Sequence, residues 1–146
     1  MKFMVIVPAS KESETGVIKP SDAEMFEKMG KFNEELVKAG VMLAGEGLLA
    51  SSKGSRITFG AAGKTAVHDG PFTESKELVA GFWIIQVKSK AEAEAWMSRA
   101  PFQEGTVLEI RQIATDDDLA AADPTGELRA ADEKLRAQVA KQHHQS

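Results

Sequence analysis

Residues 78–87, LVAGFWIIQV, form the longest apolar run of the chain and anchor the prediction of its fold. A nearly continuous apolar run of this length predicts a strand. Because it lacks the polar alternation of a strand with one wet face, such a strand is buried on both faces or lies at the centre of a sheet. We therefore expect the other elements to be arranged around this segment.

The chain before this run begins with a strand and a helix. Residues 2–7 predict a short buried strand, and a polar loop at 9–20 follows. A helix is expected to begin at Ser21, where Glu24 completes a capping box, and Gly40 stands where a glycine commonly ends a helix. The apolar stripe of this helix has helical spacing and consists of Met25, Met29, Phe32 and Leu36.

The remaining segments complete a mixed pattern of strands and helices. Residues 41–49 (VMLAGEGLL) predict a strand, and residues 55–59 and 64–68 predict a β-hairpin around GAAG. After the central run, residues 89–101 predict a capped helix and residues 106–113 (TVLEIRQI) the last strand. The order indicates an α+β fold, a ferredoxin-like βαββαβ plan with an inserted β-hairpin.

Two helices on one face of such a sheet leave the other face to be covered. In a chain of this size a second copy of the chain is the economical cover, so the sequence predicts a homodimer. Residues 1–114 are expected to form this domain. Residues 115–146 are expected to form a C-terminal peripheral helix and tail, with Asp123 and Pro124 at the start of the helix.

Composition excludes several classes of function. The formal net charge is −4 and the basic residues are scattered, which argues against a nucleic-acid partner. The chain has no cysteine, so it has no disulfide, thiolate nucleophile or cysteine metal site. No apolar run reaches the roughly 20 residues of a membrane span. These features predict a cytoplasmic protein without a membrane partner, a cofactor or a metal site.

The stretch HDGPF, residues 68–72, carries the strongest candidate for chemistry. His68 and Asp69 are a residue pair suited to proton transfer near neutral pH. Neighbouring strand residues point to opposite faces, however, so the two can act together only if a turn begins at His68. The same stretch is also a turn signal, in which Asp69 can accept backbone hydrogen bonds and Phe72 can anchor the loop.

Three further charged residues are candidates for ligand binding. Glu46 lies between two glycines in an otherwise apolar strand, and Glu77 is the last residue before the central run. Arg111 alternates with Glu109 on the last strand and could neutralise one of these acids or anchor an anion. A structural ion pair is the simpler interpretation of the arginine.

The stretch DGPFTESKE, followed by an apolar strand and by AEAEAWMSRAP and GTVLEIRQI, resembles the DGPF-domain proteins of the YCII-related family. The resemblance covers residues 2–113 and implies a ferredoxin-like subunit that dimerises into a dimeric α+β barrel. It implies no particular activity. Within the motif it carries over Asp69, whereas position 68 varies in the family.

The sequence leaves open whether the protein is an enzyme. One hypothesis is a homodimeric barrel whose cleft, lined by Glu46, Asp69, Phe72 and Glu77, binds a small molecule and carries out acid/base chemistry. The alternative is a non-catalytic binding or regulatory module with the C-terminal helix as its partner surface. The resemblance to DGPF proteins, which are often encoded near alternative sigma factors, implies this option. A cofactor-free oxygenase is a third option, which the absence of tyrosine and the presence of only three histidines weaken.

Overall fold

The computed structural model describes residues 1–73 and 77–144 of the chain. The chain divides into two compact units, Met1–Gln112 and Ile113–Ser146. The first unit holds the sheet with its two long helices, and the second holds the C-terminal helix.

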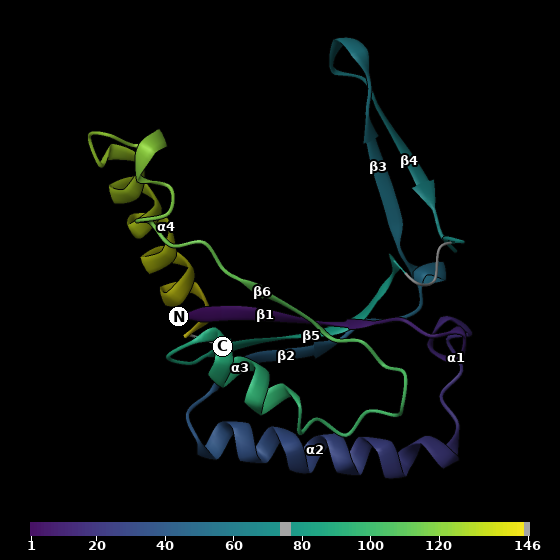
Figure 1. The fold of residues 1–146 in the computed structure, drawn as a ribbon. Coiled ribbons are helices and arrows are strands. Elements are labelled where there is room, and N and C mark those ends of the chain that lie inside the picture. The colour runs from purple at the N-terminus through teal and green to yellow at the C-terminus, as the bar shows by residue number, and fades with distance from the viewer. Residues whose placement is uncertain (74–76, 145–146) are drawn as a thin grey trace. The chain divides into compact units, whose positions relative to one another are not determined.

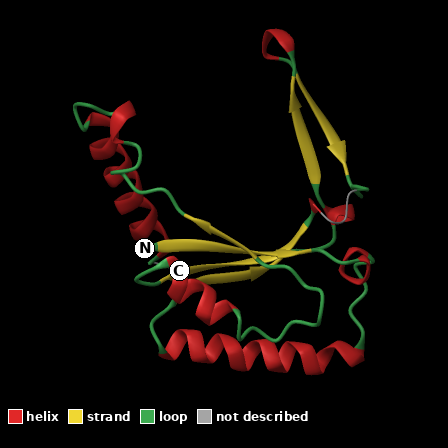
Figure 2. Ribbon diagram, viewed as in Figure 1, coloured by secondary structure: helices red, strands yellow, loops and turns green. Residues whose placement is uncertain are grey.

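The first unit is built on a four-stranded antiparallel sheet, which confirms the predicted α+β class (Figure 1, Figure 2). Its strands are β1 (Lys2–Pro8), β2 (Met42–Gly47), β5 (Val79–Gln86) and β6 (Glu109–Gln112), and its long helices are α2 (Ala23–Lys38) and α3 (Lys90–Met97). The strand order β2-β5-β1-β6 is the order that a ferredoxin-like plan requires. The apolar run 78–87 supplies β5, which pairs with both β1 and β2 and is therefore central as predicted.

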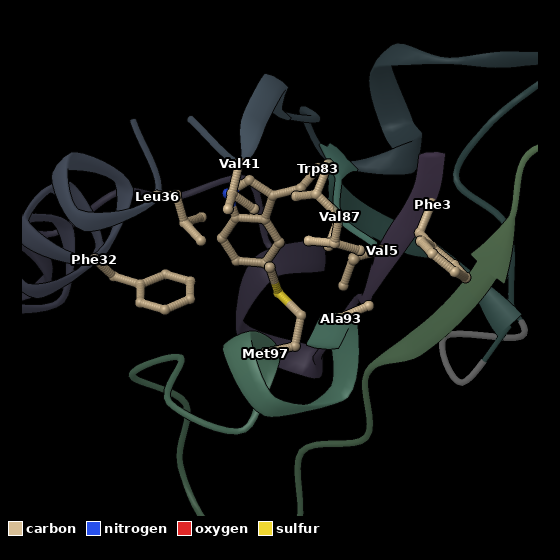
Figure 3. Packing of buried hydrophobic residues seen from close by; sticks show 10 residues of the cluster. Phe3, Val5, Phe32, Leu36, Val41, Trp83, Val87, Ala93 and Met97 are labelled. Carbon is tan, nitrogen blue, oxygen red and sulfur yellow. The ribbon is translucent and has the colours of Figure 1, made fainter. Parts of the chain in front are cut away.

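Both long helices pack on one face of the sheet, and the hydrophobic core lies between them and that face (Figure 1, Figure 3). The core residues are Phe3, Val5, Phe32, Leu36, Val41, Trp83, Ile85, Val87, Ala93 and Met97. The Trp83 ring meets Phe32 of α2 edge to face, with ring centroids 5.9 Å apart. Phe3 and Val5, which alternate along β1, thus pack in the same layer as the apolar stripe of α2.

The ends of the helices test the capping predictions. The C-terminal prediction for α2 is confirmed, because Gly40 has a positive φ of 70° and its N–H donates to the Val37 carbonyl oxygen at 3.0 Å. The N-terminal prediction is wrong. Residues Pro20–Asp22 form a 3-10 turn, η1, and α2 begins only at Ala23. The Asp22 carboxylate accepts a hydrogen bond from Lys19 N–H at 2.8 Å, which stabilises the 3-10 turn.

The opposite face of the two central strands is also apolar. Met4 and Ile6 on β1 lie opposite Ile84 and Phe82 on β5, and these four side chains are half-buried. Directly opposed residues share one face of a sheet, so the four form a single apolar patch. We call Met4, Ile6, Phe82 and Ile84 the open-face patch.

A two-stranded hairpin stands between β2 and β5 in the chain. It consists of β3 (Ser55–Phe59) and β4 (Thr65–Asp69), joined through the 3-10 turn η3 (Ala61–Gly63). Figure 1 shows it projecting from the sheet on the side opposite to α2. Every residue of the two strands is exposed, including Ile57, Phe59 and Val67, which the register places on one face.

Two short helical turns are joined to each other near the base of this hairpin, since Ser51 of one bonds to Glu14 of the other. One is η2 (Ser51–Lys53), which follows β2. The other is α1 (Lys11–Glu14), a single turn inside the segment 9–20 that the sequence predicted to be a loop. Ser10 caps α1, since its hydroxyl accepts a hydrogen bond from Ser13 N–H at 3.1 Å.

The second unit contains α4 (Glu127–His143), preceded by the 3-10 turn η5 (Ala120–Ala122). The helix begins three residues later than predicted, at Glu127 rather than at Pro124. Asp123 still caps the first turn of α4, because its carboxylate accepts hydrogen bonds from the backbone N–H groups of Arg129 and Leu128, each at 3.0 Å. These two bonds lower the pKa of Asp123. No helix in the described part of the chain is long and apolar enough to cross a bilayer.

Candidate functional site

The turn Asp69-Gly70-Pro71 leaves the end of β4 and packs its backbone against η2. The Gly70–Pro71 peptide bond is cis, and Gly70 N–H donates to the Gly54 carbonyl oxygen at 2.9 Å. A Cβ placed on Gly70 would lie 1.8 Å from the carbonyl oxygen of Ser51. The close approach of two backbones therefore requires glycine at position 70.

Ser51 ties this turn to the N-terminal segment. Its hydroxyl accepts a hydrogen bond from Phe72 N–H at 3.0 Å and donates to a carboxylate oxygen of Glu14 at 2.5 Å. The other carboxylate oxygen of Glu14 accepts from Ser51 N–H at 3.0 Å. Three segments far apart in the sequence thus meet at one half-buried serine.

Phe72 also contacts the base of the hairpin. The guanidinium of Arg56 lies over its ring, 3.9 Å from the ring centroid, which is the geometry of a cation–π interaction. Arg56 is paired with His68 across the hairpin, so the two side chains share a face. A cation, rather than a carboxylate, is therefore the cross-strand neighbour of His68.

Asp69 lies on the other face of the hairpin. The strand β4 continues through Asp69, so His68 and Asp69 follow the alternation and point in opposite directions. The Asp69 carboxylate is exposed and accepts no hydrogen bond from any residue of 1–73 or 77–144. Within the described part of the chain, therefore, only the backbone of the turn positions the carboxylate, and both of its oxygens are without a partner there.

The other three predicted residues are distributed over the first unit. Glu77 is exposed just before β5. Glu46 and Arg111 lie on the two edge strands of the sheet, which are roughly 14 Å apart at about 4.8 Å between adjacent strands. Arg111 forms an exposed ion pair with Glu109 at 3.3 Å. The described residues include no group of three or more acidic or histidine side chains that could hold a metal ion.

A pocket of about 220 Å³ lies within the first unit, between α2 and the end of the sheet where β2 and β5 carry glycines. Glu46 is among its lining residues, together with Asn33 of α2 and Trp83 of β5. None of the other five candidates is among the described residues that line it. The structure therefore separates two features, the HDGPF turn at the base of the hairpin and this pocket.

Sequence reasoning missed the residues that support both features. Ser51 and Arg56 contact Phe72, and Glu14 holds Ser51, yet each belongs to a different segment, and only the fold brings them together. Asn33, which lines the pocket, lies in the middle of α2 next to the buried Phe32. This position in the sequence could have identified it as a candidate. A polar residue beside the apolar stripe of a helix often has a partner in the core.

Replacing Ser51 with alanine is expected to lower the free energy of unfolding by about 1–2 kcal/mol. The substitution removes a hydrogen bond to a charged carboxylate and leaves Phe72 N–H without its acceptor. Urea denaturation followed by tryptophan fluorescence measures the change. Ser52→Ala, at the exposed neighbouring position, is the control. Equal stability of the two variants would show that the serine does not hold the turn.

Comparisons with known proteins give a family match and a distant structural similarity. A family model described as the YCII-related domain matches residues 1–133. A solved structure of 5-chloro-2-hydroxyhydroquinone dehydrochlorinase (TftG) from Burkholderia phenoliruptrix AC1100, in complex with 2,5-dihydroxybenzoquinone, is similar at 19% sequence identity. The match covers 81% of this chain and 99% of that chain, with a TM-score of 0.42. No curated protein matches the chain.

Proposed function

The chain belongs to the YCII-related domain family, and we propose that it is a homodimeric small-molecule-binding protein in which a second copy covers the open face of the sheet. The observation that carries this proposal is the open-face patch. Both faces of the two central strands are apolar, while α2 and α3 pack on only one of them. Burying a fully exposed large apolar side chain contributes about 1.5–3 kcal/mol, and the four side chains in each copy, which are half-buried, can still gain roughly half of this value each.

The hairpin supports the same proposal. An isolated two-stranded hairpin is marginally stable in water. Its exposed apolar face consists of Ile57, Phe59 and Val67, with exposed fractions of 58%, 82% and 64%. A second copy that packs against this face would bury it and hold the HDGPF turn at the base of the hairpin.

Asp69 is the proposed proton-transfer group. Its carboxylate is free of hydrogen bonds from the described residues, so it can accept a proton or a hydrogen bond from a bound molecule. His68 faces the other side of β4, beside Arg56, where it could shuttle a proton only for a ligand that reaches around the strand. Of the two residues, Asp69 is thus the one that we assign to chemistry.

A thermal-shift screen of wild type and Asp69→Asn against a metabolite library tests this function. A ligand that binds the folded state stabilises it by mass action, by about 2.7 kcal/mol at a concentration one hundred times its Kd. We expect Asp69→Asn to keep the unliganded melting temperature, because no described residue depends on the carboxylate. Wild type should convert a bound compound at least tenfold faster than the variant.

Two results would contradict the proposal in different ways. Equal conversion by wild type and Asp69→Asn would remove the catalytic role of the carboxylate and leave a binding protein. A screen without any stabilising compound would reject small-molecule binding itself.

A second candidate function is a non-catalytic regulatory module that uses α4 as its partner surface. Leu128, Leu135 and Val139 follow a helical stripe on α4, and more than half of each side chain is exposed. This stripe is a surface on which a partner protein could dock. Full-length Leu135→Glu should then lose the partner while retaining every ligand found in the screen.

A further inference from the structure

Two glycines lie in the floor of the pocket between α2 and the sheet. Val7, Gly81 and Gly47 lie side by side across β1, β5 and β2 and all line the pocket. Val7 packs against the core, so this row faces the helices. Gly81 and Gly47 have no side chains, so these two positions contribute none to the space between the sheet and the helix.

The two glycines have different causes. A Cβ on Gly81 would come within 2.9 Å of the Glu46 carbonyl oxygen, so backbone packing explains that glycine. A Cβ on Gly47 would have no atom within 4 Å, and its φ lies outside the left-handed region. Neither backbone conformation nor packing requires a glycine at position 47. Gly47 is exposed and lines the pocket, so its missing side chain leaves this side of the pocket open.

The walls of the pocket are aromatic, and among the described side chains that line it the Asn33 amide is an available hydrogen-bond donor. Trp83 and Phe102 meet edge to face, with ring centroids 6.1 Å apart, and both line the pocket with Met29. Trp83 Nε1 donates to Asn33 Oδ1 at 2.9 Å. Since the indole nitrogen is a donor only, this bond fixes the orientation of the amide. Asn33 Nδ2 is then left without a partner among the described residues.

From these features we propose that the pocket binds an uncharged, single-ring aromatic compound that accepts a hydrogen bond from Asn33. The volume of about 220 Å³ exceeds the roughly 150 Å³ of a cavity that holds benzene, and it is too small for fused ring systems with large substituents. The lining includes the carboxylate residue Glu46 and no described lysine or arginine. An anionic ring would therefore lack a countercharge. The inference rests on the proposed small-molecule function and names its site and ligand class.

Tryptophan fluorescence can report occupancy of this pocket directly. The chain has two tryptophans, so Trp96→Phe leaves Trp83, in the pocket wall, as the sole emitter. Benzamide and benzoate are the probes, because they share ring and size while benzamide is neutral and benzoate is anionic. We expect benzamide to change the Trp83 emission in a saturable way and benzoate to bind at least tenfold more weakly.

Substitution of Gly47 then tests the location. Gly47→Phe places a phenyl ring on the pocket floor and is expected to weaken benzamide binding at least tenfold. Gly30→Phe is the matched control, since Gly30 lies on α2 outside the pocket lining and its Cβ position is equally open. Asn33→Asp keeps an acceptor for Trp83 and removes the amide donor, so it should also weaken benzamide at least tenfold.

The outcomes separate this inference from the function on which it rests. Loss of benzamide binding in Gly47→Phe, with retention in Gly30→Phe, supports the site. Equal binding of benzamide, or of a library compound, to wild type and Gly47→Phe overturns the site but leaves small-molecule binding intact. Equal affinity for benzoate overturns the uncharged class. If neither probe nor any library compound binds, both the inference and the proposed function fail.

Discussion

Replacing Gly70 with alanine is expected to lower the free energy of unfolding by about 3 kcal/mol. The added Cβ would lie 1.8 Å from the Ser51 carbonyl oxygen, and neither partner can rotate away because both belong to the backbone. Relief requires the turn to move off η2. That movement breaks the hydrogen bonds from Gly70 N–H to Gly54 and from Phe72 N–H to Ser51. Urea denaturation of the full chain measures the loss.

Gly54→Ala is the matched control for this prediction. The Cβ of alanine at position 54 would lie 3.5 Å from the same Ser51 oxygen, an ordinary contact, and φ is −107°. Its stability should stay within about 0.5 kcal/mol of wild type. If Gly70→Ala is as stable as Gly54→Ala, the turn does not pack on η2 as described, and the role assigned to the glycine of the motif is wrong.

The fold was predictable because its main signals are periodic and local. The run 78–87 predicted a strand that is central or buried on both faces, and the apolar stripe of α2 predicted its buried face without knowledge of the sheet. The start of α2 was not predictable from the capping box at Ser21. A cap contributes only about 1 kcal/mol, and the bond from Lys19 N–H to Asp22 stabilised a 3-10 turn instead.

The candidate site was less predictable because its parts are not local. Adjacent residues in the sequence suggested a pair, yet strand alternation separates His68 from Asp69. The roles of the glycines could not be predicted from the sequence either. Gly45, Gly47 and Gly81 look alike in the sequence, but only the structure distinguishes two that neighbouring atoms constrain from one that faces open space.

Replacing Ile84 with lysine is expected to convert the proposed homodimer into a monomer. Ile84 lies in the middle of the open-face patch, between Met4 on β1 and Ala44 on β2. In a dimer that covers this patch, an ammonium group would be buried without a partner in each copy. A cost of roughly 3 kcal/mol weakens the dimer by about a hundredfold. In a monomer the flexible lysine can reach water, so the fold itself should persist.

Light scattering at matched concentrations decides this prediction. Val37→Lys, at an exposed position of α2 on the helical side, is the control and should keep the mass of wild type. A monomeric wild type would reject the dimer outright. A dimeric Ile84→Lys with unchanged affinity would place the interface elsewhere, and the exposed apolar face of the hairpin would be the next surface to test.

If Ile84→Lys is a monomer while wild type and Val37→Lys are dimers, the open-face patch is part of the dimer interface. The benzamide titration of the same variant would then show whether the pocket, whose described lining lies within one chain, needs the partner at all.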